Sequence, residues 1–336
     1  TVEDAKSMGY IIPDNYTSYD DNRFKSATGE YAVPRLNFDN VDKLMKAAHE
    51  NGVKLRGHTL VWHQQTPKYF FQQNYKITTG QKYNTSKECM DTRLEFYVKT
   101  VMNHVLSSEY ADCLYSYDVV NEYLHSANAE KDSKNITYWG LIYGTYDKSV
   151  KDHGVTLRPS YVKDAFKYAH EMLVKYDRLD VKLIYNDYNC YQNPENIIHL
   201  VDYINSDGKV CDGIGMQSHL DITDSFHSAT NYAKALEYFR LNCPDLEIQI
   251  TELDATMVST EDKPLTDEDQ AAYYDQIMNA ILTNKKNGGN ITTLIIWSLY
   301  DGVSWRPAKF PCLFNGLYMP KAAFYAVIDA KKQYWD

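Results

Sequence analysis

The stretch VKLIYNDYNCYQNPENIIHLVDYIN, residues 181–205, contains one complete repeat of the pattern that decides the fold. Its first five residues are largely apolar and predict a short buried strand. Polar residues follow at 186–189, and a segment of helical period occupies 194–205. A strand, a polar loop and a helix in this order are typical of one βα unit.

The same alternation extends along most of the chain. Short apolar runs predict six buried strands, at 53–62, 113–120, 181–185, 211–216, 247–251 and 291–297. Segments of helical period predict seven helices, at 39–50, 86–106, 160–177, 194–205, 228–241, 266–286 and 320–334. Thr85 with Glu88 and Thr266 with Asp269 have the spacing of a capping box, and Gly52 stands where the first helix should end. Alternating strands and helices predict a parallel sheet.

Polar or aromatic residues stand at the C-terminal end of each predicted strand. These groups are Trp62-His63, Asn121-Glu122, Asn186-Asp187-Tyr188-Asn189, Gln217-Ser218-His219, Glu252-Leu253-Asp254 and Trp297-Ser298. A doubly wound sheet uses one restricted switch point for its ligands, whereas a TIM barrel gathers the ends of all its strands in a ring. We therefore expect an α/β fold of the TIM (β/α)8 barrel type. The prediction is a single domain, with the barrel in residues 38–336 after an irregular N-terminal segment, 1–37.

Composition narrows the range of partners. The chain has 336 residues, with 45 acidic and 35 basic side chains, so its formal net charge is −10. Nucleic acid and an anionic membrane are therefore unfavourable partners. No apolar run approaches the roughly 20 residues that span a membrane. The 30 Tyr, 11 Phe and 5 Trp residues provide flat apolar faces with polar rims, which suit sugar rings.

The six cysteines are scattered, without a CxxC or CxxH pair, so a zinc site is not expected. In a domain of this size, isolated cysteines are more often small buried hydrophobic residues, although three disulfides remain open.

Two glutamates, Glu122 and Glu252, each end an apolar strand, where burial and neighbouring groups can set the protonation state. Hydrolysis of a glycosidic bond needs such a pair. One carboxylic acid protonates the leaving oxygen, and one carboxylate attacks the anomeric carbon or activates water. The pair therefore suggests an acid and a base.

Six segments in this order and spacing resemble the signature segments of glycoside hydrolase family 10, which is chiefly endo-β-1,4-xylanases. They are LRGHTLVWH at 55–63, DVVNE at 118–122, YNDYN at 185–189, GMQSHL at 215–220, ITELD at 250–254 and WSLYDGVSWR at 297–306. The resemblance covers residue 38 to the C-terminus. It implies a retaining hydrolase that uses no metal or organic cofactor and acts on xylan and xylo-oligosaccharides.

The resemblance also implies roles for individual residues. Glu122 is the acid/base on the fourth strand, Glu252 is the nucleophile on the seventh, and His219 orients the nucleophile by a hydrogen bond. Further residues expected to bind the sugar are Trp62, His63, Asn121, Asn186, Tyr188, Gln217, Trp297 and Trp305. Tyr188 is expected near the acid/base. Arg306 and Asp301 are expected to hold the last loop by an ion pair.

The chain departs from the family pattern at its N-terminus. The family has two strands before the LRGHTLVWH strand, and residues 1–37 show a helix start and a polar loop instead. A barrel without them would expose two sheet edges. We expect a lost N-terminal segment, an inserted module such as a carbohydrate-binding module, or another chain to complete it. Tyr117 replaces the usual Trp, and the connection 125–159 is longer than the family needs.

Two other functions stay open. In the family, the second of the two missing strands ends in a motif whose Asn, Glu and Lys contact substrate upstream of the cut. A non-catalytic or weakly active xylan-binding relic would explain the absence of this motif from the sequence. A β-1,4-glucanase would differ in whether the pocket admits a hydroxymethyl group, a difference of about 1–3 kcal/mol. Because a polymer is cut outside the cell, a secreted or extracellular location is expected.

Overall fold

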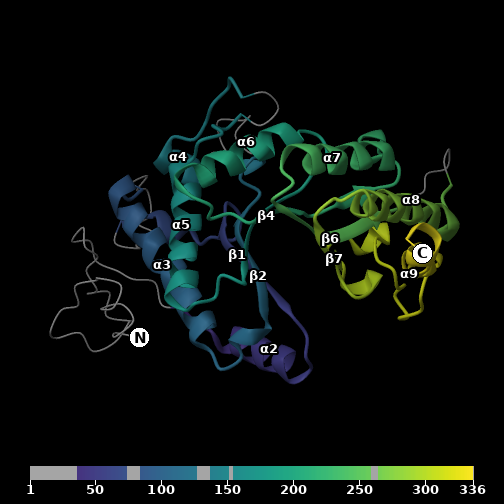
Figure 1. Cartoon of the computed structure of the whole chain (residues 1–336), viewed down its shortest axis with the longest axis horizontal. Coiled ribbons are helices and arrows are strands. Elements are labelled where there is room, and N and C mark those ends of the chain that lie inside the picture. The colour runs from purple at the N-terminus through teal and green to yellow at the C-terminus, as the bar shows by residue number, and fades with distance from the viewer. Residues whose placement is uncertain (1–35, 74–83, 127–136, 151–153, 259–263, 336) are drawn as a thin grey trace. The chain divides into compact units, whose positions relative to one another are not determined.

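The computed structural model describes residues 36–73, 84–126, 137–150, 154–258 and 264–335 (Figure 1). It divides into two compact units. Unit 1 comprises Thr1–Tyr185 and Leu200–Cys211, and unit 2 comprises Asn186–His199 and Asp212–Asp336. The prediction of two strands missing from residues 1–37 concerns a segment that lies almost entirely outside the described residues.

Unit 1 contains parallel strands in the order β1-β2-β3: β1 (Leu55–Trp62), β2 (Leu114–Asn121) and the start of β3 (Lys182–Asp187). Its helices are α2 (Asp39–Glu50), α3 (Lys87–Ser107), α4 (Tyr138–Tyr143) and α5 (Ser160–Lys175), and the last turns of α6 (Pro194–Ile204) also belong to it. Helix α3 packs against α5. The pairing of β1 with β2 places Trp62 beside Asn121, so the two strands end together.

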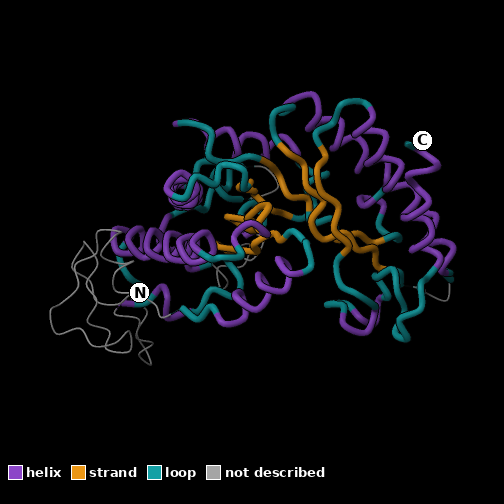
Figure 2. The backbone as a smooth tube through the Cα atoms, turned by 60° about the horizontal axis from the view of Figure 1, so that its bottom comes forward, coloured by secondary structure: helices purple, strands orange, loops and turns teal. Residues whose placement is uncertain are grey.

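Unit 2 is organised around β6 (Glu247–Thr256), which pairs in parallel with β4 (Gly213–Met216), β5 (His219–Asp221) and β7 (Ile291–Ile296). Its helices are α7 (Ala229–Asn242), α8 (Asp267–Lys286) and α9 (Ala322–Tyr334), and α8 packs against both of the others. Helices lie on the outside of these strands (Figure 2). Strand β4 is buried throughout, and nine of the ten residues of β6 are buried, as expected for parallel strands covered by helices.

Helix ends follow local sequence. Thr266 and Asp269 form the predicted capping box of α8. The prediction for α3 is wrong by one residue, because Ser86 rather than Thr85 is the N-cap and accepts a hydrogen bond from the Cys89 amide. Helix α2 ends at Glu50, and Gly52 follows with a φ of 64°, a left-handed conformation that glycine adopts without a steric penalty.

All six predicted strands and all seven predicted helices are present, with ends shifted by a few residues. The short elements β5 and α4 were not predicted.

All six cysteines are free, and five of them are buried, which confirms the interpretation as small hydrophobic residues. Tyr117 lies against Gly57 so closely that a Cβ at position 57 would fall 2.3 Å from the tyrosine ring.

Candidate active site

Glu122 directly follows β2, and its side chain is buried with 8% exposed. The indole Nε1 of Trp62, at the end of β1, donates a hydrogen bond to Glu122 Oε2 at 2.8 Å. The backbone φ of Glu122 is 57°, in the left-handed region that costs a non-glycine residue free energy. Strain of this kind persists only where the surroundings hold it, and it concentrates at functional sites.

Asp118, on β2 four residues before Glu122, contacts His58, which the sequence did not mark as a site residue. His58 Nδ1 lies 2.9 Å from Asp118 Oδ2, and the guanidinium of Arg56 forms an ion pair with the same carboxylate. His58 is four residues before Trp62 on β1, and the two rings lie 6.5 Å apart. The ladder between β1 and β2 is irregular between His58 and Val61, so simple alternation along the strand does not relate His58 to Trp62, and the sequence spacing gave no signal for His58.

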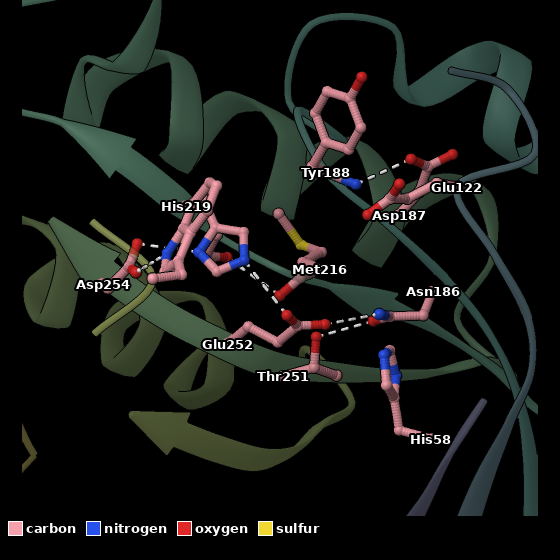
Figure 3. Close-up of polar contacts among 12 residues, drawn as sticks. His58, Glu122, Asn186, Asp187, Tyr188, Met216, His219, Thr251, Glu252 and Asp254 are labelled. Atoms are coloured by element: carbon pink, nitrogen blue, oxygen red, sulfur yellow. Dashed lines mark hydrogen bonds and ion pairs between the residues drawn. The ribbon is translucent and has the colours of Figure 1, made fainter. Parts of the chain in front are cut away.

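Glu252, on β6, is held through both carboxylate oxygens (Figure 3). Asn186 Nδ2 donates to Oε1 at 2.9 Å, and His219 Nε2 lies 3.2 Å from Oε2. The Asn186 amide is oriented in turn by Thr251, whose hydroxyl donates to Asn186 Oδ1 at 2.7 Å. The predicted contact between His219 and Glu252 is therefore present, and Asn186 contacts this carboxylate as well.

His219 connects Glu252 to a second buried carboxylate. Its Nδ1 lies 2.9 Å from Asp254 Oδ1, and Asp254 is fully buried (Figure 3). Burial alone would lower the pKa of His219, but the hydrogen bonds and negative charges of Asp254 and Glu252 outweigh burial and raise the pKa to about 9. At neutral pH the ring is therefore an imidazolium that donates to both carboxylates and stabilises their charge.

Two indoles lie beside this histidine. The Trp305 ring lies 4.7 Å from the His219 ring, and its Nε1 donates to Asp254 Oδ2 at 2.8 Å. Trp297 directly follows β7, with its ring 6.0 Å from that of His219 in an edge-on arrangement. Half of Trp305 remains exposed. Unit 2 thus brings together two of the three predicted indoles with the predicted nucleophile and its histidine.

The expected ion pair between Arg306 and Asp301 is wrong. Asp301 instead pairs with buried Lys321 at 3.4 Å and accepts a hydrogen bond from the Cys312 amide. The Arg306 guanidinium lies 3.8 Å from the centre of the Trp305 ring, as a cation–π contact. Asp301 thus anchors the loop after β7 through Lys321, whereas Arg306 contacts its neighbour in sequence.

The remaining predicted residues also lie at strand ends. Asn121 is the last residue of β2 and is buried, and His63 is half-buried directly after β1. Gln217 is buried between β4 and β5, and its backbone N–H donates to the backbone carbonyl of Asp187 at 2.9 Å. Tyr188 directly follows β3. It belongs to unit 2 and Glu122 to unit 1, so its expected place near the acid/base stays a prediction.

Within the described residues, no group of three or more His, Cys, Asp or Glu side chains is arranged to hold a metal ion. No helix in the described ranges is long and apolar enough to cross a membrane.

A family model for glycosyl hydrolase family 10 matches residues 5–330. The chain belongs to this family. The match begins well before residue 38, so it includes much of the N-terminal segment that the signature segments do not cover. An endo-1,4-β-xylanase A of Butyrivibrio fibrisolvens is 40% identical over 331 residues, which are 98% of this chain and 70% of that protein.

Solved structures of family 10 proteins share the fold. One contains the CBM22-1 and family 10 modules of a Clostridium thermocellum endo-1,4-β-D-xylanase in complex with xylohexaose. It has a TM-score of 0.72 and 28% identity, covering 95% of this chain and 58% of that one. A mutant of an intracellular xylanase of Thermoanaerobacterium saccharolyticum, in complex with xylotriose, has a TM-score of 0.69 and 30% identity. It covers 87% of this chain and 81% of that one. The α/β TIM barrel class is therefore confirmed.

Proposed function

We propose that this chain is an endo-1,4-β-xylanase that cleaves xylan with retention of anomeric configuration. The observation that carries the proposal is Glu252, a buried carboxylate held through both oxygens by Asn186 and His219. Membership of family 10 and a similar protein named as an endo-1,4-β-xylanase support the substrate class.

Glu252 acts as the nucleophile in this proposal. Its carboxylate attacks the anomeric carbon of the sugar on the non-reducing side of the cut, and the bond from that carbon to the glycosidic oxygen breaks. The product is a covalent glycosyl-enzyme ester. The hydrogen bonds from Asn186 and His219 fix the direction of the carboxylate before attack, so little reorganisation is needed in the transition state.

Glu122 acts as the acid and then as the base. It transfers its proton to the leaving glycosidic oxygen, and its carboxylate then accepts a proton from the water that hydrolyses the ester. The indole N–H of Trp62 can only donate, so Glu122 Oε2 must accept. The carbonyl oxygen of a carboxylic acid is the better acceptor, so this hydrogen bond favours the protonated form with the transferable proton on the other oxygen, Oε1. Trp62 thus favours delivery of the proton from Oε1.

The other residues support binding in this proposal. Asn121 precedes the acid/base and hydrogen-bonds a sugar 2-hydroxyl, a contact that strengthens in the transition state. Trp297 and Trp305 supply apolar faces for sugar rings. A polymeric substrate favours action outside the cell, although the similar protein from T. saccharolyticum is described as intracellular.

Two alanine variants test the division of labour. Glu252→Ala should abolish hydrolysis of every substrate, because no covalent intermediate can form. Glu122→Ala should lose about 100-fold to 10,000-fold on xylan and on aryl xylobiosides with poor leaving groups, but far less on dinitrophenyl xylobioside, whose leaving group needs no proton. Equal losses on all substrates would contradict the acid/base role. Proton NMR of the first products should show the β-anomer, and initial α-anomer would contradict retention.

A further inference from the structure

The connection after Glu122 carries a tryptophan that reaches back to the residue contacting the acid/base. Trp139, in α4, donates from its indole Nε1 to the main-chain carbonyl of Trp62 at 3.1 Å. Trp62 in turn donates from its own indole to Glu122 Oε2 at 2.8 Å. We propose that Trp139 is a positioning residue for the acid/base, which it aligns through Trp62. The proposal rests on the catalytic role proposed for Glu122.

Trp139 is itself held rigidly. Its side chain is 3% exposed. The ring stacks on Tyr161 of α5, with centroids 4.8 Å apart and planes inclined by 10°, and it meets Phe71 edge-on at 5.1 Å. The Thr137 hydroxyl caps α4 by accepting from the Gly140 amide at 3.1 Å. An indole confined in this way presents its N–H in one direction, so it can act as a fixed donor.

The acceptor lies where β1 ends. Trp62 is the last residue of β1, and the register between β1 and β2 also ends there, at its pair with Asn121. At this end of the strand two side-chain donors contact the Trp62 carbonyl oxygen, the Trp139 indole at 3.1 Å and the Thr66 hydroxyl at 2.7 Å. Together they fix the Trp62 peptide and, through it, the direction in which the side chain leaves the backbone.

The chemical consequence concerns the proton of Glu122. The left-handed backbone of this residue is a strained conformation that its surroundings must maintain. A small rotation of the Trp62 indole would release Oε2 and let the carboxyl group turn, and proton delivery depends on hydrogen-bond geometry. Weakening the contact between Trp139 and Trp62 should therefore slow only those reactions that need the proton.

The experiment compares three variants on aryl xylobiosides with leaving groups of different basicity. Trp139→Phe keeps an aromatic ring but removes the indole donor, and Thr66→Val removes the other donor near the surface without changing shape. Each should lower kcat about fivefold for phenol-like leaving groups, with KM and the rate for dinitrophenyl xylobioside little changed. The matched control is Phe71→Leu, which perturbs the same aromatic cluster but removes no hydrogen bond. It should lower stability and slow all substrates alike.

A double variant and a spectrum complete the test. In a Trp62→Phe background, Trp139→Phe should cause no further loss of selectivity, because it acts through Trp62. The five tryptophans give an assignable set of indole ¹⁵N–¹H signals. The Trp62 signal should move in Trp139→Phe and Thr66→Val but stay in Phe71→Leu. Equal slowing of all leaving groups in Trp139→Phe and Thr66→Val, or an unmoved Trp62 signal in these two variants, would overturn the proposal. An inactive wild-type protein would instead refute the proposed function, and the spectrum would then still show whether Trp139 orients Trp62.

Discussion

Deprotonation of His219 should weaken the fold at alkaline pH. The pKa of this ring is raised from the ordinary 6.5 to about 9, because its hydrogen bonds to Asp254 and Glu252 and their charges outweigh the effect of burial. The difference corresponds to about 3 kcal/mol of unfolding free energy, at about 1.4 kcal/mol per pH unit. A raised pKa stabilises the folded state fully below about pH 6.5, and this stabilisation is lost as the pH rises through about 9.

The assay is denaturant unfolding of the wild type and of His219→Asn at a series of pH values from about 6 to about 10. Titrating groups that do not contact His219 affect both proteins alike, so the difference in unfolding free energy reports His219 together with the two carboxylates that it contacts. It should shrink by about 3 kcal/mol across this range. His227→Asn is a control of opposite sign, because burial lowers the pKa of His227 and its stabilising contribution is lost as the pH falls. A difference for His219→Asn that is constant or grows with pH would refute the reasoning.

Two further substitutions test local features. Ser86→Ala should cost about 1 kcal/mol in unfolding experiments, because the first turn of α3 loses its cap, whereas Ser86→Asp should retain it; equal stability of all three proteins would contradict this role. Lys321→Met should cost about 3–5 kcal/mol, because Asp301 is then left buried and charged without its partner. Adding Asp301→Asn should recover part of that loss, and thermal unfolding that shows no recovery would exclude the ion pair as the cause.

The elements of the fold were predictable because each is encoded locally. An apolar run such as 181–185 or a helical period such as 266–286 needs no knowledge of the rest of the chain. The features that were not predicted correctly depend instead on contacts and backbone geometry beyond the local sequence. Strand β5 has only three residues, and it exists because His219 pairs with Asp254 of β6. The α3 cap was assigned to Thr85 instead of Ser86, because boundaries depend on backbone geometry that composition does not specify.

The sequence by itself determined the strand-helix pattern and the two candidate carboxylates, since Glu122 and Glu252 each directly follow or end an apolar run. Only the tertiary structure decided what those carboxylates contact. Asn186 donates a hydrogen bond to Glu252, which is 66 residues away in the sequence, and Trp62 donates one to Glu122, which is 60 residues away. The physical reason is that hydrophobic periodicity records which face of an element is buried, whereas a hydrogen bond depends on the packing that brings two distant elements together.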